Sequence, residues 1–167
     1  MAVTYKKIAT ATAGSGGSST FDFTSIPSTY TDLVLHVSAR CTTDNANAKI
    51  SFNGSTSSFT SRLLEAEPGI VYSASRTDNL NLFFITPSSY TASTFGSAFI
   101  YIANYAGSTN KSFSTDSCTE NNATASVSRL LAGLWSNTAA INQITLTPQG
   151  TAFAQYSTAT LYGISKS

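Results

Sequence analysis

The stretch that decides the fold class is Thr31-Asp-Leu-Val-Leu-His-Val-Ser-Ala39. Leu33, Leu35 and Val37 alternate there with a more polar set of side chains that includes His36. Because successive side chains of an extended chain point to opposite faces, this period of two predicts a β-strand with one buried face. It is the clearest strand pattern in the chain.

Similar segments lie on both sides of this stretch. The longest, residues 95–105, is apolar on both faces, which indicates a central strand. Turn-forming pairs such as Asn53-Gly54 separate the segments. The chain is therefore expected to hold about nine or ten strands. The remaining ones are expected at residues 5–10, 19–23, 50–52, 79–84, 111–115, 127–134, 142–147 and 158–164.

Residues 127–134 fit two patterns. Their apolar side chains have the i, i+3, i+4, i+7 spacing of an amphipathic helix, which favours a helix. Gly133 opposes it, because a glycine destabilises a helix by about 1 kcal/mol, and the run is short. We therefore expect a strand here, with a helix as the alternative.

Length and composition point to one β domain. The chain has 167 residues, enough for one domain with one core. Only 10% of the residues are charged, whereas about 25% is usual. Ser and Thr make up about a third of the chain, and Thr, Tyr and Phe favour strands. We expect residues 1–167 to form a single all-β domain, an antiparallel two-sheet β-sandwich.

The charge balance argues against two classes of partner. The formal net charge is +1, too small to attract the phosphates of nucleic acids or an anionic membrane. The chain also lacks the run of about 18 apolar residues that a membrane helix needs, and residues 1–10 lack the apolar run of a signal peptide. We expect neither nucleic acid nor a membrane as a partner.

The N-terminal residues 1–20 of the domain are expected to form an arm and a Gly/Ser-rich loop. Residues 11–20 contain Gly14, Gly16 and Gly17 among serines, which is typical of a flexible loop because such a segment buries no apolar area. This loop would leave residues 1–10 as a flexible arm that pairs with the sheet edge of another protein. The candidate partner-contact residues in the arm are Tyr5, Lys6, Lys7 and Ile8.

Residues suited to catalysis are scarce. His36 is the single histidine, and its strand pattern predicts a half-buried sheet residue. Glu65 and Glu67 would be about 6.6 Å apart on one strand face, within the range of glycosidase carboxylates. Because Pro68-Gly69 marks a loop, we interpret both as solvated loop residues. We expect no enzymatic activity, no catalytic residue and no cofactor.

Metal ligands are equally sparse. Cys41 and Cys118 are expected to be free thiols, and with His36 they supply at most three zinc ligands without paired spacing. No calcium-loop spacing is present, so we expect no metal centre and leave a structural ion open. The oxygen-bearing side chains for such an ion are either Asp44 and Asn45, or Asp116 with Glu120 and Asn121.

Four stretches of the chain, in two regions, carry a resemblance to a known group of proteins. Near the C-terminus these are Gly133-Leu-Trp-Ser-Asn-Thr-Ala-Ala-Ile-Asn-Gln-Ile-Thr-Leu-Thr and Ser157-Thr-Ala-Thr-Leu-Tyr-Gly-Ile164. Earlier in the chain it is Phe23-Thr-Ser-Ile-Pro-Ser-Thr-Tyr-Thr-Asp-Leu-Val-Leu35, followed by Phe52-Asn-Gly54. These stretches resemble small β-sandwich virion structural proteins of tailed bacteriophages, and the likeness spans most of the chain.

The resemblance implies a jelly-roll-like sandwich on the surface of a virion. Related modules are often homotrimers that decorate or cement the capsid, so the implied partner is the major capsid protein or another virion protein. The chain also lacks the sustained heptads that a fibre stalk needs. We expect a capsid decoration protein that binds and stabilises the assembled head, by preferring the lattice over the free subunit.

The alternative is a tail-fibre or head-fibre module that binds the host receptor. In that reading aromatic side chains stack on host surface glycans, and the candidate platforms are Tyr72, Tyr90 and Trp135. Aromatic residues of a sandwich more often belong to its core. The sequence favours the capsid over the host surface, since nearly all of the chain belongs to one compact domain.

Overall fold

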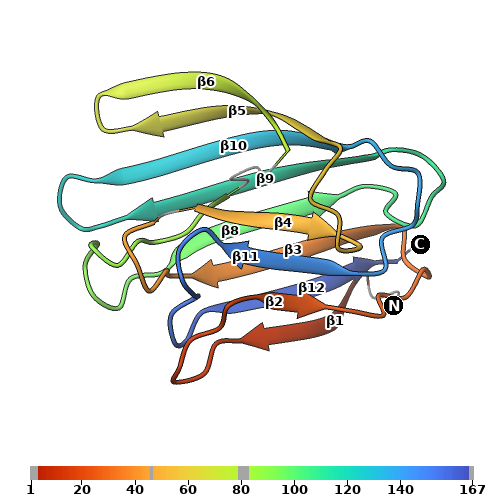
Figure 1. Cartoon of the computed structure of the whole chain (residues 1–167), viewed down its shortest axis with the longest axis horizontal. Helices are drawn as coiled ribbons and strands as arrows, with labels where there is room; N and C mark the ends of the chain where they lie inside the picture. Colours follow the sequence, from red (N-terminus) through yellow and green to blue (C-terminus); the bar gives the residue numbers. More distant parts are fainter. Residues whose placement is uncertain (1–3, 46, 79–82, 166–167) are drawn as a thin grey trace.

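The computed structural model describes residues 4–45, 47–78 and 83–165. Every named element in these ranges is a β-strand, and the strands pair antiparallel in two sheets of eight and four strands (Figure 1). The predicted all-β, antiparallel, two-sheet architecture is confirmed. No helix in the described part of the chain is long and apolar enough to cross a membrane.

The order of strands within each sheet differs from their order in the sequence. The large sheet contains, from one edge to the other, β1 (Tyr5–Thr12), β12 (Thr158–Ile164), β3 (Asp32–Ala39), β8 (Gly96–Ile102), β9 (Lys111–Glu120), β10 (Ser126–Trp135), β5 (Phe59–Glu67) and β6 (Ile70–Thr77). The small sheet contains β2 (Phe21–Phe23), β11 (Ile144–Pro148), β4 (Asn47–Phe52) and β7 (Phe83–Phe84).

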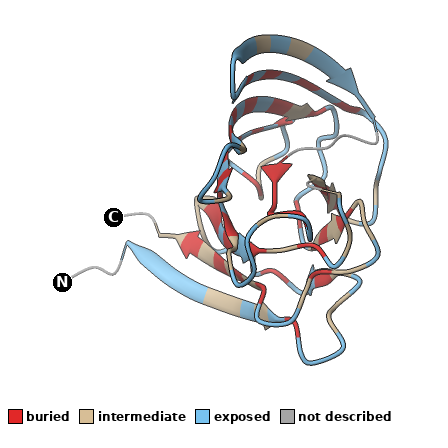
Figure 2. Ribbon diagram, turned by 90° about the vertical axis from the view of Figure 1, so that its left-hand side faces the viewer, coloured by how far each residue is buried: buried red, intermediate tan, exposed pale blue. Residues whose placement is uncertain are grey.

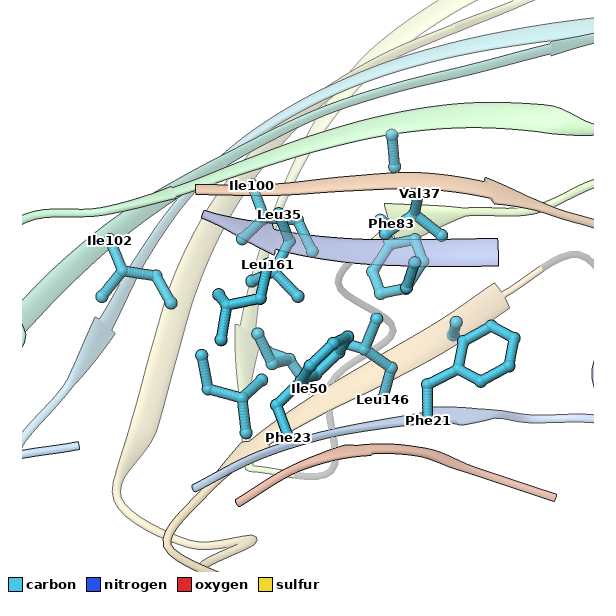
Figure 3. Packing of buried hydrophobic residues seen from close by; sticks show 14 of the residues in the cluster. Phe21, Phe23, Leu35, Val37, Ile50, Phe83, Ile100, Ile102, Leu146 and Leu161 are labelled. Carbon is cyan, nitrogen blue, oxygen red and sulfur yellow. The ribbon is translucent and has the colours of Figure 1, made fainter. Parts of the chain in front are cut away.

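The core lies between the two sheets. Leu35 of β3 pairs with Ile100 of β8 on one side and with Leu161 of β12 on the other, and all three are fully buried. From β4 in the small sheet, Ile50 points back toward this layer (Figure 3). The strand predicted at residues 31–39 is confirmed, and its apolar face builds the core.

The described residues contain twelve strands, more than the nine or ten expected. The hairpin of β5 and β6 lies where a loop was predicted around Pro68-Gly69. These two residues form only a tight turn, in which Gly69 adopts a φ of +79°. Of the strand expected at residues 79–84, residues 79–82 lie outside the described residues, and Phe83 and Phe84 form β7.

Residues 127–134 belong to strand β10, which confirms the strand over the helix. Gly133 pairs with Phe113 of β9, and a Cβ at Gly133 would lie only 2.2 Å from an atom of the Phe113 ring. The glycine is therefore needed for close packing of the ring against the strand. The same residue that disfavours a helix thus has a specific place in the sheet.

The strand predicted at residues 5–10 is confirmed, but the prediction of a flexible N-terminal arm is wrong for the residues that the structure describes. Tyr5–Thr12 is β1, which pairs with β12 at the edge of the large sheet, so it is not a flexible arm. The glycines form a turn, because the Gly17 amide donates to the Gly14 carbonyl oxygen at 2.9 Å. Ser18 and Phe153 then exchange two backbone hydrogen bonds. Glycine permits positive φ and close approach here, and the loop is held in place.

The large sheet is covered on one face and open on the other. In β9, buried and exposed residues alternate along all ten positions, and β5 and β10 show nearly the same alternation. Figure 2 shows this as stripes on the strands. The outermost strand, β6, is mostly exposed. Strand β8 is central, as predicted, but one of its two apolar faces belongs to the open side.

Replacing Gly133 with alanine is expected to lower the free energy of unfolding by about 1–3 kcal/mol, because the added methyl group overlaps the Phe113 ring and forces it to repack. Denaturant unfolding followed by circular dichroism measures the loss. Gly14→Ala is the matched control, since no heavy atom lies within 4 Å of a Cβ built there. Equal losses in the two variants would contradict the packing role of Gly133.

Candidate functional site

The four predicted partner-contact residues lie together at one border of the large sheet. We call residues 5–8 the β1 edge. Tyr5, Lys6 and Lys7 are exposed. The Tyr5 ring forms an edge-to-face pair with Tyr162 of β12, with the two ring centroids 6.3 Å apart. Ile8 differs, because it lies at an irregularity of the pairing and packs, partly buried, on the core. Three of the four side chains are therefore available to a partner.

The backbone of the β1 edge is also available. The Ser165 amide donates to the Thr4 carbonyl oxygen at 2.9 Å, and the following residue, Tyr5, pairs with Ile164. Hydrogen-bonded and non-bonded pairs alternate in an antiparallel ladder. The N–H and C=O groups of Tyr5 and Lys7 consequently point away from β12. No described strand lies on that side, so these groups are open to pairing.

Glu65 lies in β5 and is buried, with only 1% of its surface exposed. The Arg129 Nε of β10 donates to its Oε2, and the Tyr72 hydroxyl of β6 donates to its Oε1 at 2.7 Å. Arg129 also donates to the Asn47 side-chain oxygen at 2.9 Å, and its guanidinium lies 4.6 Å from the centre of the Phe84 ring. The interpretation of Glu65 as a solvated loop residue is wrong.

The two glutamates have different environments. Burial raises the pKa of Glu65, but the hydrogen bonds from Arg129 and Tyr72 outweigh it and leave the pKa lowered. Glu67 is exposed, and the neighbouring Glu65 carboxylate raises its pKa. Glu65 is held as a charged partner of Arg129, which is a structural arrangement.

Replacing Glu65 with glutamine is expected to lower the free energy of unfolding by about 3 kcal/mol near neutral pH, because the buried Arg129 charge loses its counter-charge. The folded-state pKa of Glu65 is lowered, so its contribution is present above the ordinary value of 4.5 and is lost as pH falls through the folded pKa. Denaturant unfolding at a series of acidic pH values tests this, and the variant should show a flatter pH dependence.

Glu67→Gln is the matched control for this experiment, because Glu67 is exposed on the same strand. It is expected to change the free energy of unfolding by less than about 0.5 kcal/mol. A Glu65→Gln protein as stable as the Glu67→Gln protein would contradict the structural role of the buried pair.

The remaining titratable candidates are dispersed. His36 is exposed, more so than predicted, and its ring forms T-shaped pairs with Phe99 and Tyr162, with centroid distances of 5.2 Å and 5.4 Å. Cys41 is buried, Cys118 is exposed, and both are free. Within residues 4–45, 47–78 and 83–165, no three His, Cys, Asp or Glu side chains are close enough together to hold a metal ion. Asp44, Asp116 and Glu120, the acidic candidates for a structural ion, are therefore not part of such a cluster.

The three candidate stacking platforms differ in how far they are buried. Trp135 is fully buried in the core, so its assignment as a glycan platform is wrong. Tyr72 is half-buried and its hydroxyl is bonded to Glu65. Tyr90 is half-buried on a loop that Arg40 holds by donating to backbone carbonyl oxygens, including that of Tyr90 at 2.8 Å. Only Tyr72 and Tyr90 keep some exposed surface.

The structure shows a second surface that was not predicted from the sequence. Four large apolar side chains lie exposed on the open side of the large sheet, and we call them the apolar outer face. Their exposed fractions are 38% for Phe99, 51% for Leu64, 54% for Leu130 and 71% for Val71. Phe99, Leu64 and Leu130 line one shallow depression. Such clustering marks a contact surface more often than scattered exposed residues do.

A sequence signal for this surface exists. Leu63-Leu64 and Leu130-Leu131 are apolar pairs, and adjacent residues of a strand point to opposite faces. Each pair therefore places one leucine in the core and one outside, as the burial of Leu63 and Leu131 shows. Without knowledge of the strand neighbours, the outward leucines cannot be assigned to one patch.

The comparisons with known proteins add no relative to this picture. No family model matches the chain, and neither a curated protein nor a solved structure matches it.

Proposed function

We infer that eight of the strands follow jelly-roll connectivity. The inference rests on the order β1-β12-β3-β8 in the large sheet and β2-β11-β4-β7 in the small one. In this order, four consecutive strand pairs, β1/β2, β3/β4, β7/β8 and β11/β12, are each divided between the two sheets, as in a double Greek key. The hairpins β5–β6 and β9–β10 are then insertions that widen the large sheet.

We propose that the protein is a non-enzymatic structural component of a tailed-bacteriophage virion, which decorates and stabilises the assembled capsid. The resemblance of the sequence to such virion proteins supports this proposal, and jelly rolls occur in viral capsid proteins as well as in lectins. The partner is then the major capsid protein, and the site of action is the particle surface. The homotrimer that the resemblance implies stays a prediction, which the native mass of the protein tests.

The observation that carries the proposal is the open β1 edge. Its outward N–H and C=O groups at Tyr5 and Lys7 suit the addition of a strand from a capsid subunit, a common mode of protein recognition. The exposed Lys6 and Lys7 ammonium groups add two positive charges beside these backbone groups. A surface that engages a strand presented only by the assembled lattice would stabilise the shell by mass action.

The double variant Tyr5→Pro, Lys7→Pro tests strand addition. Proline removes the two outward N–H groups, and edge strands tolerate proline where the N–H faces solvent. Loss of two hydrogen bonds of about 1 kcal/mol each is expected to weaken binding to undecorated phage heads roughly thirty-fold. Co-sedimentation of the purified variant with heads measures this loss.

The double variant Tyr5→Ala, Lys7→Ala is the matched control, since it changes the same side chains and retains both N–H groups. Binding that falls equally in both variants would show that side chains, and not backbone pairing, make the contact. If the wild-type protein sediments with host cells and not with heads, the capsid proposal is wrong. The alternative function, a fibre or receptor-binding module that contacts host glycans, would then take its place. A wild-type protein that sediments with neither would overturn both.

A further inference from the structure

The apolar outer face has an ordered arrangement of apolar and charged residues. In the register of the sheet, Phe99 of β8 lies beside Asp116 of β9, which lies beside Leu130 of β10, which lies beside Leu64 of β5. Side chains directly opposite in neighbouring strands are about 5 Å apart, so these four form one row across the sheet. Apolar side chains occupy three of the four places in this row.

The next row along the strands carries the complementary charge. Ala132 of β10 lies between Ser114 of β9 and Arg62 of β5. Arg62 and Asp116 are thus on opposite sides of β10, one row apart, and both are exposed. Neither takes part in an ion pair within the described residues. Glu120 is the other charged residue that faces outward on β5, β9 and β10. It lies at the end of β9, apart from both rows.

We propose that the apolar outer face binds a second copy of this chain, through a two-fold contact between two identical faces. The two-fold axis lies in the plane of the face and crosses β10 between Leu130 and Ala132. Arg62 and Asp116 lie on opposite sides of this axis and symmetrically about it. Rotation about the axis therefore brings Arg62 of each copy over the partner's Asp116. The ion pair forms twice, once on each side of the axis.

The same rotation matches the apolar side chains. It places Leu130 of one copy against the partner's Leu64, so that both exposed leucines become covered. A contact of this kind is self-complementary and closes after two copies, as two-fold interfaces do. The strands that carry the face are already hydrogen-bonded in the sheet, so little chain ordering opposes the association.

Other features of the face favour a protein contact. Apart from Arg62 and Asp116, the outward side chains around Leu130 are uncharged and mostly small, namely Ser114, Cys118, Ser128, Ala132, Ala66 and Ser73. Depletion of charge in the centre is typical of protein–protein interfaces. The face and the β1 edge lie in different parts of the large sheet, so the contact goes beyond the proposed capsid function and does not depend on it.

The native mass of the full chain tests the two-fold contact. Sedimentation equilibrium of the wild-type protein is expected to give twice the chain mass of 17.5 kDa, and not the three times that the homotrimer implied by the resemblance requires. Arg62→Asp and Asp116→Arg each place like charges over one another at two positions, so each is expected to raise the dissociation constant about tenfold or more. The double variant Arg62→Asp, Asp116→Arg restores opposite charges and is expected to recover the wild-type dissociation constant.

Two further variants separate this contact from general effects. Leu130→Ser removes an exposed apolar group and is expected to yield a monomer that unfolds like the wild type. Lys6→Asp, a charge reversal on the β1 edge, is expected to leave the dimer intact even if it abolishes binding to phage heads. A wild-type monomer, a trimer, or a double variant that stays as dissociated as the single ones would overturn the two-fold contact, whatever the outcome with heads.

Discussion

The alternation of side chains along β3 and its neighbours is the constraint on which the rest of the structure depends. Leu35, Ile100 and Leu161 occupy equivalent places in three adjacent strands and meet the small sheet. A shift of one residue in any of these strands would turn its apolar set toward solvent, so burial determines the register. Once the inner face is set, the identity of every outward residue follows from it.

The hairpins β5–β6 and β9–β10 extend this constraint beyond the small sheet. Their inner face buries Glu65 and Arg129, which are compatible with burial because each has a charged or polar partner there. Lys111, at the start of β9, is buried in a similar way, since its ammonium group donates to backbone carbonyl oxygens such as that of Gly107 at 2.7 Å. Burial lowers the pKa of Lys111. Polar groups thus complete the inner face where apolar residues are few.

Both proposed contacts lie on the large sheet. At one border, the β1 edge offers backbone groups and two lysines. Farther across the sheet, Leu64, Phe99 and Leu130 offer apolar area beside one arginine and one aspartate. Edge pairing and face packing use different groups, so a single rigid sheet can hold two partners at once.

The sequence by itself determined the strands at residues 31–39 and 95–105, the strand that contains Gly133, and the two-sheet class, because alternation and turn chemistry are properties of neighbouring residues. Only the tertiary structure decided that Glu65 is buried, since its partner Arg129 lies in another hairpin. The same holds for the docking of Tyr5–Thr12 on β12 and for the gathering of Leu64 and Leu130. These features depend on which distant strands become neighbours, and local patterns contain no information on that choice.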